Sequence, residues 1–191
     1  QESMPVGTGG MVAIIGKKLI DVEKILPEIQ KHGKIFIAND NADGQVVLSG
    51  EIKAIEFICK NYKEFSIKRA IQLPVSAPFH CELIESASIK LENKIAVQKF
   101  NNFIFPLYSN VTAEPCDNET IKDLLVRQIV NRVRWRDSIE NMIRDGVDYF
   151  IEVGPGNVLS NLVKRINKQV SVTSISSVED LEKIKLIDFN L

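Results

Sequence analysis

The sequence has few of the residues that build metal centres, disulfide frameworks or membrane spans. Its 191 residues include three cysteines, Cys59, Cys81 and Cys116, and two histidines. The cysteines are odd in number and form no CxxC pair, which argues against a disulfide framework or a zinc site and favours a reducing, cytoplasmic location. No apolar run approaches the roughly 20 residues that cross a bilayer. We therefore expect no metal and no membrane partner.

A dominant charge is also missing. Lysine and arginine together number 24 and aspartate and glutamate 25, so the formal net charge is −1. Such a chain has no strong global field to attract nucleic acid or an anionic membrane. Basic residues do gather locally, at 60–69, 132–136 and 164–165. These clusters are either solvated faces or surfaces that steer an acidic partner.

The N-terminus carries neither an initiating methionine nor a secretory signal. Its first residues, Q-E-S-M-P, have no basic flank and no apolar core region. We therefore expect the sequence to begin partway through a longer protein. With 45% hydrophobic residues, it can bury one good core or two small ones.

Residues 10–73 follow the order of a ferredoxin-like βαββαβ domain. Residues 39–44, N-D-N-A-D-G, are typical of a turn within it. RNA-binding domains share this order but need aromatic residues on a central strand for base stacking. Residues 46–48 are all aliphatic, so nucleic acid is not an expected partner. The expected strands are 11–15, 34–38, 46–48 and 68–73, and the expected helices are 17–32 and 52–62.

From residue 74 onward, strands alternate with helices. Such alternation implies a parallel sheet covered on both faces. The expected helices are 81–98, 119–129, 136–145, 157–166 and one starting at 178, and the expected strands are 103–109, 149–153 and 170–175.

The segment Leu73–Cys81, L-P-V-S-A-P-F-H-C, is the most informative part of the chain. It places His80 after a strand and at the expected start of a helix, where α/β proteins position chemical groups. An imidazole can accept and return a proton near neutral pH. The nucleophilic serine that such a base usually serves, on a G-x-S-x-G turn, occurs nowhere in the 191 residues. Ser76 lacks flanking glycines and is interpreted as structural. The pattern indicates half of an acyl-transfer site.

Six segments resemble the malonyl-CoA:acyl carrier protein transacylases of type II fatty acid synthesis. Each alone is a weak signal, but all six follow the family's order at compatible spacings. Together they cover nearly the whole chain and resemble the C-terminal two-thirds of the enzyme. The segments are 1–16, 39–50 (N-D-N-A-D-G-Q-V-V-L-S-G), 73–80 (L-P-V-S-A-P-F-H), 104–115 (I-F-P-L-Y-S-N-V-T-A-E-P), 128–135 (Q-I-V-N-R-V-R-W) and 150–166 (F-I-E-V-G-P-G-N-V-L-S-N-L-V-K-R-I).

The resemblance implies an α/β fold in two parts. A ferredoxin-like subdomain would span residues 10–73, and residues 74–191 would form the C-terminal part of an α/β-hydrolase-like acyltransferase domain whose N-terminal part is absent. In this family, a serine takes malonyl from coenzyme A and passes it to the phosphopantetheine thiol of acyl carrier protein, without a cofactor. The family's serine elbow and the arginine that binds the malonyl carboxylate have no counterpart in this sequence.

The resemblance also implies roles for five residues. His80 would be the general base. Gln128 matches a glutamine whose backbone carbonyl accepts a hydrogen bond from that histidine, the alternative being an ordinary helix-terminal residue. Phe79 matches a residue that limits bulk beside the malonyl α-carbon, the alternative being a core aromatic. Asn39 and Asn41 would shape a turn or contact the pantetheine arm.

Two neighbouring features are interpreted as structural. Cys81 adjoins His80, but such a cysteine is more often a small buried residue. Gly154-Pro155-Gly156 precedes an expected helix and could hold a phosphate, although a tight strand-to-helix turn accounts for it better. A further possibility for the whole chain is a catalytically inactive fragment that folds or binds carrier protein without performing transfer.

Overall fold

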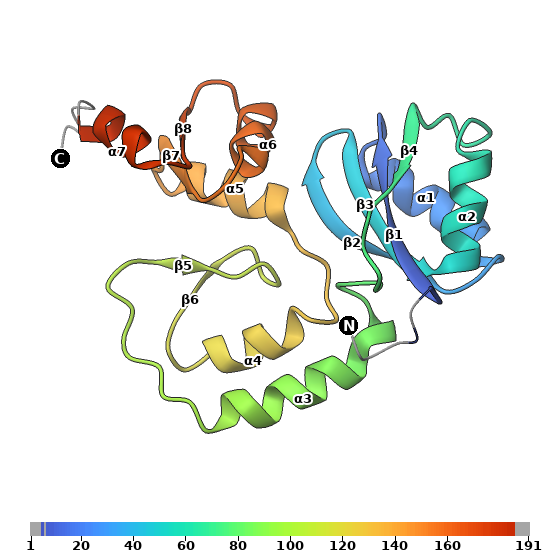
Figure 1. The fold of residues 1–191 in the computed structure, drawn as a ribbon, viewed down its shortest axis with the longest axis horizontal. Coiled ribbons are helices and arrows are strands. Elements are labelled where there is room, and N and C mark those ends of the chain that lie inside the picture. The colour runs from blue at the N-terminus through green and yellow to red at the C-terminus, as the bar shows by residue number, and fades with distance from the viewer. Residues whose placement is uncertain (1–4, 6, 186–191) are drawn as a thin grey trace. The chain divides into compact units, whose positions relative to one another are not determined.

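The computed structural model describes residue 5 and residues 7–185, and the side chains up to residue 181 (Figure 1). The first family-like segment, 1–16, therefore lies partly outside the described residues. The chain forms two compact units, one up to Ser138 and one from Ile139 onward. The division after residue 73 expected from the sequence stays a prediction.

An antiparallel four-stranded sheet with two helices opens the first unit, and the predicted order of strands and helices is confirmed. The strands lie side by side in the order β2-β3-β1-β4, all antiparallel. The bounds are β1 Gly9–Ile15, α1 Leu19–Gln30, β2 Ile35–Ala42, β3 Gln45–Glu51, α2 Ile52–Asn61 and β4 Arg69–Gln72.

Alternation along β1 and β3 gives this sheet two apolar faces. Val12, Ile14 and Leu48 are fully buried on the face that packs against residues of α1 and α2. On the other face, a smaller cluster of Met11, Ala13, Ala38 and Val47 packs against Leu73 and Phe79. Because Leu73 and Phe79 lie in the segment that carries His80, the sheet also supports the candidate site.

The predicted turn at 39–44 is wrong for most of its length. β2 continues to Ala42, and only Asp43 and Gly44 form the turn. The pairing of β2 with β3 is irregular between Ile37 and Asn39 and again between Asp40 and Ala42. These irregularities accommodate Asn and Asp residues in a strand that local signals assign to a turn.

The rest of the first unit departs further from the expectations. The predicted buried strand 103–109 is wrong, since only β5, Leu107–Tyr108, is a strand, and Phe105 is 79% exposed. β5 pairs antiparallel with β6, Pro115–Cys116. The helix predicted from residue 81 begins as a short 3-10 turn, Glu82–Ile84, followed by α3, Glu85–Ala96. α4 spans Ile121–Arg127, and α5, Trp135–Arg144, begins in the first unit and ends in the second.

The second unit contains a parallel two-stranded sheet. β7, Tyr149–Val153, pairs with β8, Ser171–Ile175, and α6, Val158–Ile166, connects them. α7, Val178–Lys185, follows β8. The predicted strands, helices and parallel pairing are confirmed here. The expectation that helices cover both faces of this sheet is not confirmed, since Val153 is 78% exposed. None of the described helices is long and apolar enough to span a membrane.

Candidate active site

His80 lies in the loop between β4 and the 3-10 turn rather than at the start of an α-helix, as expected from the sequence. Its backbone φ is +59°, a left-handed conformation that is uncommon for residues other than glycine. Such conformations are retained only where the surroundings enforce them, and they cluster at functional sites.

The loop before His80 is held against the sheet by hydrogen bonds and close packing. The N–H of Leu73 donates to the carbonyl of Met11 at 2.9 Å, and Pro78 is fully buried. The Sγ of Cys81 donates to the Pro78 carbonyl at 3.2 Å. A Cβ added to Gly9 on β1 would lie 2.7 Å from the Pro78 ring, so this close approach requires glycine. The loop is thereby a rigid support for the imidazole.

The Nδ1 atom of His80 lies 2.9 Å from the backbone carbonyl oxygen of Gln128. Gln128 is the C-cap residue of α4, and the last carbonyls of a helix have no intrahelical partner. Because a carbonyl can only accept, Nδ1 carries the hydrogen and donates it, so Nε2 of a neutral His80 holds the lone pair. The contact implied by the resemblance is therefore present, and it selects the tautomer that a general base needs.

Asn110 lies beside this hydrogen bond, and the sequence alone did not identify it as a site residue. Its side-chain Nδ2 lies 3.5 Å from Oε1 of Gln128, and its carbonyl accepts the N–H of Arg134 at 3.0 Å. The amide side chain of Gln128 thus faces Asn110, whereas its backbone serves His80. Asn110 belongs to the S-N-V stretch of the quoted segments, which was the available signal.

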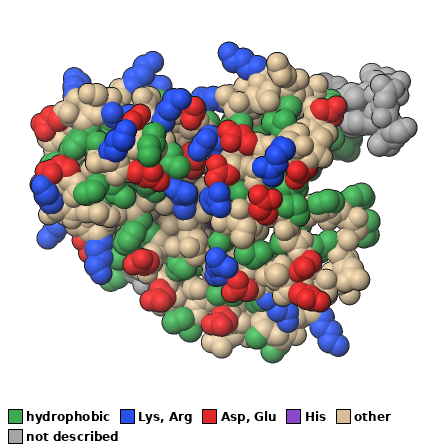
Figure 2. Space-filling model, turned by 180° about the vertical axis from the view of Figure 1, so that it is seen from behind, with side chains coloured by type: hydrophobic (Ala, Val, Ile, Leu, Met, Phe, Trp, Pro, Cys, Tyr) green, Lys and Arg blue, Asp and Glu red, His purple; other side chains and the backbone are tan. Residues whose placement is uncertain are grey.

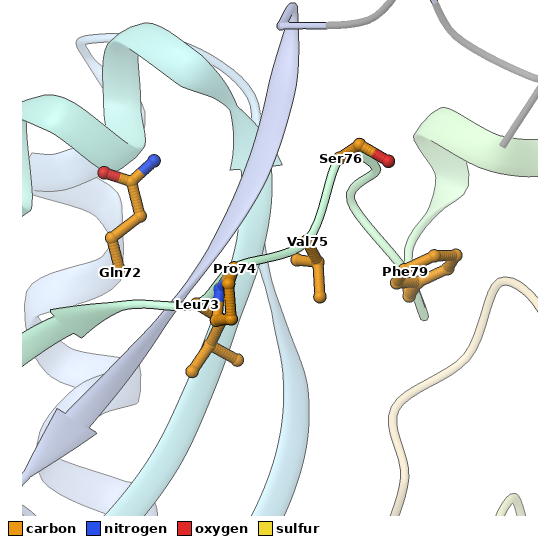
Figure 3. Close-up of a pocket in the computed structure, with 6 residues that line it drawn as sticks. All are labelled: Gln72, Leu73, Pro74, Val75, Ser76 and Phe79. Carbon is orange, nitrogen blue, oxygen red and sulfur yellow. The ribbon is translucent and has the colours of Figure 1, made fainter.

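Phe79, the residue directly before His80 in the sequence, lines an open pocket of about 640 Å³. Figure 3 shows that its labelled residues come from the end of β4 and the loop after it, with the side chains of Leu73 and Val75 on the same side. Phe79 also packs on the Met11 cluster of the sheet. The ring therefore lines a pocket and also packs on the core, and its place beside the malonyl α-carbon stays a prediction. Ser76, in the same loop, is exposed.

Asn39 and Asn41 lie on β2 and are half-buried, rather than in a turn. Asn39 forms a parallel bridge with Val133, and the N–H of Val133 donates to the Ala38 carbonyl at 2.8 Å. The structure places both asparagines where β2 meets the segment before α5. It does not bring them into the His80–Gln128 hydrogen bond.

A buried ion pair beside these asparagines was missed by the sequence. Asp40 is 1% exposed, and its Oδ2 accepts from Nη2 and Nε of Arg136 at 2.7 and 3.0 Å. Its Oδ1 is buried without a hydrogen-bond partner. The two residues stand 96 positions apart, so no local pattern could have shown the pair.

The arginines of the basic cluster at 132–136 all pair with carboxylates. Arg132 lies 3.5 Å from Glu23, Arg134 lies 2.9 Å from Asp137, and Arg136 pairs with Asp40. These three arginines therefore form ion pairs within the chain, which leaves less positive charge at this cluster to attract an acidic partner. In the view of Figure 2, lysine and arginine side chains are interspersed with aspartate and glutamate.

Cys81 is unsuited to act as a second nucleophile. It is 2% exposed, and burial raises the pKa of its thiol, which outweighs the hydrogen bonds that lower it. A raised pKa keeps the sulfur protonated at neutral pH, and the thiolate is the reactive form. The structure thus agrees with the interpretation of Cys81 as a buried residue of the loop.

Comparison with known proteins places these observations in a family context. A scan against protein-family models finds no match. The malonyl CoA-acyl carrier protein transacylase of Bacillus subtilis (strain 168) is 37% identical over 183 residues, which is 95% of this chain and 58% of that protein. The chain is homologous to part of a malonyl CoA-acyl carrier protein transacylase.

Solved structures of transacylases give the same result. The crystal structure of the Clostridium perfringens malonyl CoA-acyl carrier protein transacylase is 40% identical, with a TM-score of 0.92, and the match covers 97% of this chain and 58% of that one. A malonyl-transacylase in complex with a type II PKS acyl-carrier protein is 35% identical, with a TM-score of 0.91, over 96% and 60% of the two chains. The chain thus spans somewhat under two-thirds of the transacylases it matches.

Proposed function

We propose that this chain is the histidine-bearing part of an enzyme that transfers malonyl from malonyl-CoA to the phosphopantetheine thiol of acyl carrier protein, for fatty acid biosynthesis. The observation that carries the proposal is the 2.9 Å hydrogen bond from His80 Nδ1 to the Gln128 carbonyl. It leaves Nε2 as the proton acceptor without placing a buried charge beside the ring. The similarity to transacylases supplies the reaction and the carrier protein as partner.

In the proposed reaction, Nε2 of His80 takes the proton of a serine hydroxyl as the serine oxygen attacks the thioester carbonyl of malonyl-CoA. The C–S bond then breaks, and the sulfur of coenzyme A receives that proton from Nε2. In the second half, Nε2 takes the proton of the carrier thiol, and the thiolate attacks the malonyl-serine ester. The C–O bond breaks and the serine oxygen regains its proton, which completes a two-step transfer through a covalent ester.

Other parts of the proposal concern binding. Phe79 would limit bulk beside the malonyl α-carbon, where one extra methyl is discriminated by about 1–3 kcal/mol. Asn39 and Asn41 would contact the pantetheine arm from β2. The reaction would need neither a metal nor a cofactor besides its two substrates. Its place would be the cytoplasm, which suits the three free cysteines, Cys59, Cys81 and Cys116.

We also propose the finer description of the fold. Residues 10–73 would be a ferredoxin-like subdomain, which is supported by the antiparallel strand order β2-β3-β1-β4 with its two helices. Residues 74–191 would be the C-terminal part of an α/β-hydrolase-like acyltransferase domain, which is supported by the parallel pair β7–β8 joined through α6. The remaining strands of such a domain would come from outside these 191 residues.

The test compares two proteins by intact mass after incubation with malonyl-CoA. One is the 191-residue chain, and the other is the same chain joined behind the part of the B. subtilis transacylase that lies outside the match. We expect the joined protein to gain one malonyl group and to pass it to phosphopantetheinylated carrier protein, and the 191-residue chain to gain none. An unmodified joined protein would contradict the proposed function.

Variants of the joined protein test the roles of single residues. His80→Ala is expected to lower transfer by about 100- to 10,000-fold, the usual contribution of a general base. Gln128→Ala is expected to retain most activity, because its backbone carbonyl remains. His32→Ala is the matched control, since the other histidine is exposed and stacks on Phe57. Wild-type transfer by His80→Ala would remove His80 from the mechanism.

A second candidate function is binding of carrier protein without transfer. It is favoured by one feature, the lack of any G-x-S-x-G turn in the 191 residues. Titration calorimetry of the 191-residue chain with carrier protein tests it. Binding of carrier protein by the 191-residue chain, together with an unmodified joined protein, would favour this candidate over the transacylase.

A further inference from the structure

Ser49 is a fully buried polar residue on β3 of the four-stranded sheet. It pairs with Met11 of β1, and it shares a face of the sheet with Val47, because alternate residues of a strand point the same way. On that face, the sheet packs against the loop that carries His80. A buried hydroxyl costs free energy unless it finds a hydrogen-bond partner. The partner of Ser49 therefore decides what this residue contributes.

That partner is the thiol of Cys81, the residue directly after His80. The Ser49 hydroxyl donates to Sγ of Cys81 at 3.8 Å, and the same sulfur donates its hydrogen to the Pro78 carbonyl at 3.2 Å. The backbone N–H of Leu83 also hydrogen-bonds to this sulfur, which opposes the rise that burial causes in the pKa of the thiol. A thiol can donate one hydrogen and accept others, so the three contacts are compatible.

The three contacts connect the chain on both sides of His80. Pro78 lies two residues before the histidine and Leu83 lies three residues after it. Between them, His80 has the left-handed φ of +59°, which persists only where the surroundings enforce it. The backbone hydrogen bonds described within this loop each lie on one side of His80. The Cys81 sulfur therefore holds together two flanks that the backbone leaves separate, and Ser49 ties them to β3.

We propose that Cys81, held by Ser49, is a positioning residue for His80. Its sulfur fixes the backbone around the histidine, and that backbone directs Nδ1 toward the Gln128 carbonyl oxygen at 2.9 Å. Because hydrogen bonds weaken steeply with misalignment, a small rotation at His80 would loosen this contact. The inference rests on the proposed function, since positioning serves transfer only where His80 is the base. Cys81 itself takes part in no chemical step.

A purely space-filling role is the competing explanation for Cys81. Both explanations predict a disturbed loop when the side chain is truncated to alanine, but they differ for serine. A serine hydroxyl has the same donor and acceptor capacity as a thiol, but it is smaller. Cys81→Ser therefore keeps the hydrogen bonds, whereas Cys81→Ala removes them. Ser49→Ala removes only the donor on β3.

The first experiment determines the tautomer of His80 in the 191-residue chain by long-range proton–nitrogen NMR. It is run at about pH 8.5, where an imidazole is ordinarily neutral. In the unchanged chain, we expect the single form with its hydrogen on Nδ1, because the Gln128 carbonyl accepts there. Cys81→Ala is expected to populate the form with hydrogen on Nε2, and Cys81→Ser to restore the single form. Cys59→Ala is the matched control, because Cys59 is another partly buried free cysteine, on α2.

The second experiment measures transfer by the joined protein. Cys81→Ala is expected to lower kcat by about 10- to 100-fold, since a misplacement of about 1 Å can cost about 100-fold in rate. The KM for malonyl-CoA should stay unchanged, because Cys81 would touch no substrate. Cys81→Ser and Cys59→Ala should retain kcat. Ser49→Ala should lower kcat less than Cys81→Ala does, because the contact between Cys81 and Pro78 remains.

Three outcomes would overturn the inference. The first is a single His80 tautomer in Cys81→Ala, and the second is a mixture in Cys81→Ser, which would assign Cys81 to packing. The third is a raised KM with an unchanged kcat in Cys81→Ala. If Cys81→Ala does not fold, Ser49→Ala takes its place, and a single tautomer with an unchanged kcat in that variant would overturn the inference.

Positioning and chemistry are measured separately in this design, because the tautomer is observed without transfer. Mixed tautomers in Cys81→Ala together with an unmodified joined protein would contradict the proposed function and leave the positioning role standing. A joined protein that is acylated, with a single tautomer in Cys81→Ala, would do the reverse.

Discussion

The four-stranded sheet β2-β3-β1-β4 and the two-stranded sheet β7–β8 differ in how much of their apolar surface is buried. The four-stranded sheet of the first unit buries Val12, Ile14 and Leu48 fully against its own helices. The β7–β8 sheet leaves Val153 78% exposed on one face. Both are built from apolar strands, so hydrophobicity alone does not separate them.

The difference shows what each sheet needs from the rest of the chain. A βαββαβ unit returns two helices to one face of its sheet within about 65 residues, so its core can close from local sequence. A single parallel pair joined by one helix can cover only one face. Its other face can be covered only by residues that lie far away in the sequence.

The largest expected effect concerns the charges that the first unit buries. Arg136→Met would leave Asp40 buried and unpaired, and breaking such a pair costs about 3–5 kcal/mol. Arg127→Met is the control, because the Arg127–Asp123 pair is exposed on both sides and is expected to contribute less than about 1 kcal/mol. Urea unfolding measures both. Equal losses would mean that the buried pair is not what holds β2 to α5.

The sharpest test of the comparison truncates one isoleucine in each sheet. Ile14→Ala removes a fully buried side chain and is expected to lower the free energy of unfolding by about 2–5 kcal/mol. Ile151→Ala removes a side chain that is already 42% exposed and should cost much less in the 191-residue chain. Similar losses in urea unfolding would show that Ile151 is covered in solution.

A smaller effect is expected where β1 touches the His80 loop. Gly9→Ala would press a Cβ to within 2.7 Å of the Pro78 ring, and overpacking of this kind costs about 1–3 kcal/mol. Gly10→Ala is the neighbouring control, since its Cβ would meet nothing closer than 3.5 Å. We expect Gly9→Ala alone to shift the NMR signals of the His80 ring. A shift caused equally by both variants would remove β1 as the support of this loop.

The smallest effect depends on pH and concerns the helix-covered side of β7–β8. Hydrogen bonds from Ser160 and Leu159 lower the pKa of Glu152 from its ordinary value of 4.5. A carboxyl whose pKa is lower in the folded state stabilises the fold above its unfolded pKa and loses that effect as the pH falls through the folded pKa. The stability lost by Glu152→Gln should therefore be constant above about pH 6 and shrink below pH 4.5. A difference that does not change with pH would contradict this role.

Several errors of the sequence analysis share a cause. Residues 39–44 have the local signals of a turn, yet pairing with β3 and the contact between Asp40 and Arg136 hold most of them in a strand. Residues 103–109 look like a buried strand, but Ile104 and Phe105 are 89% and 79% exposed. In both cases, the conformation is decided by whether contacts form with residues distant in the sequence. Local strand or turn propensity contains no information about such contacts.

The sequence by itself determined the order of strands and helices in residues 9–72 and 149–185, because alternation and helical periodicity are local properties of the chain. It also indicated His80 and, through the transacylase motifs, the carbonyl of Gln128. Only the tertiary structure decided the left-handed backbone of His80, the Asp40–Arg136 pair and the bare face of β7–β8. These features depend on contacts between segments that are distant in the sequence. Packing in three dimensions decides which of these contacts form, and the local sequence pattern does not.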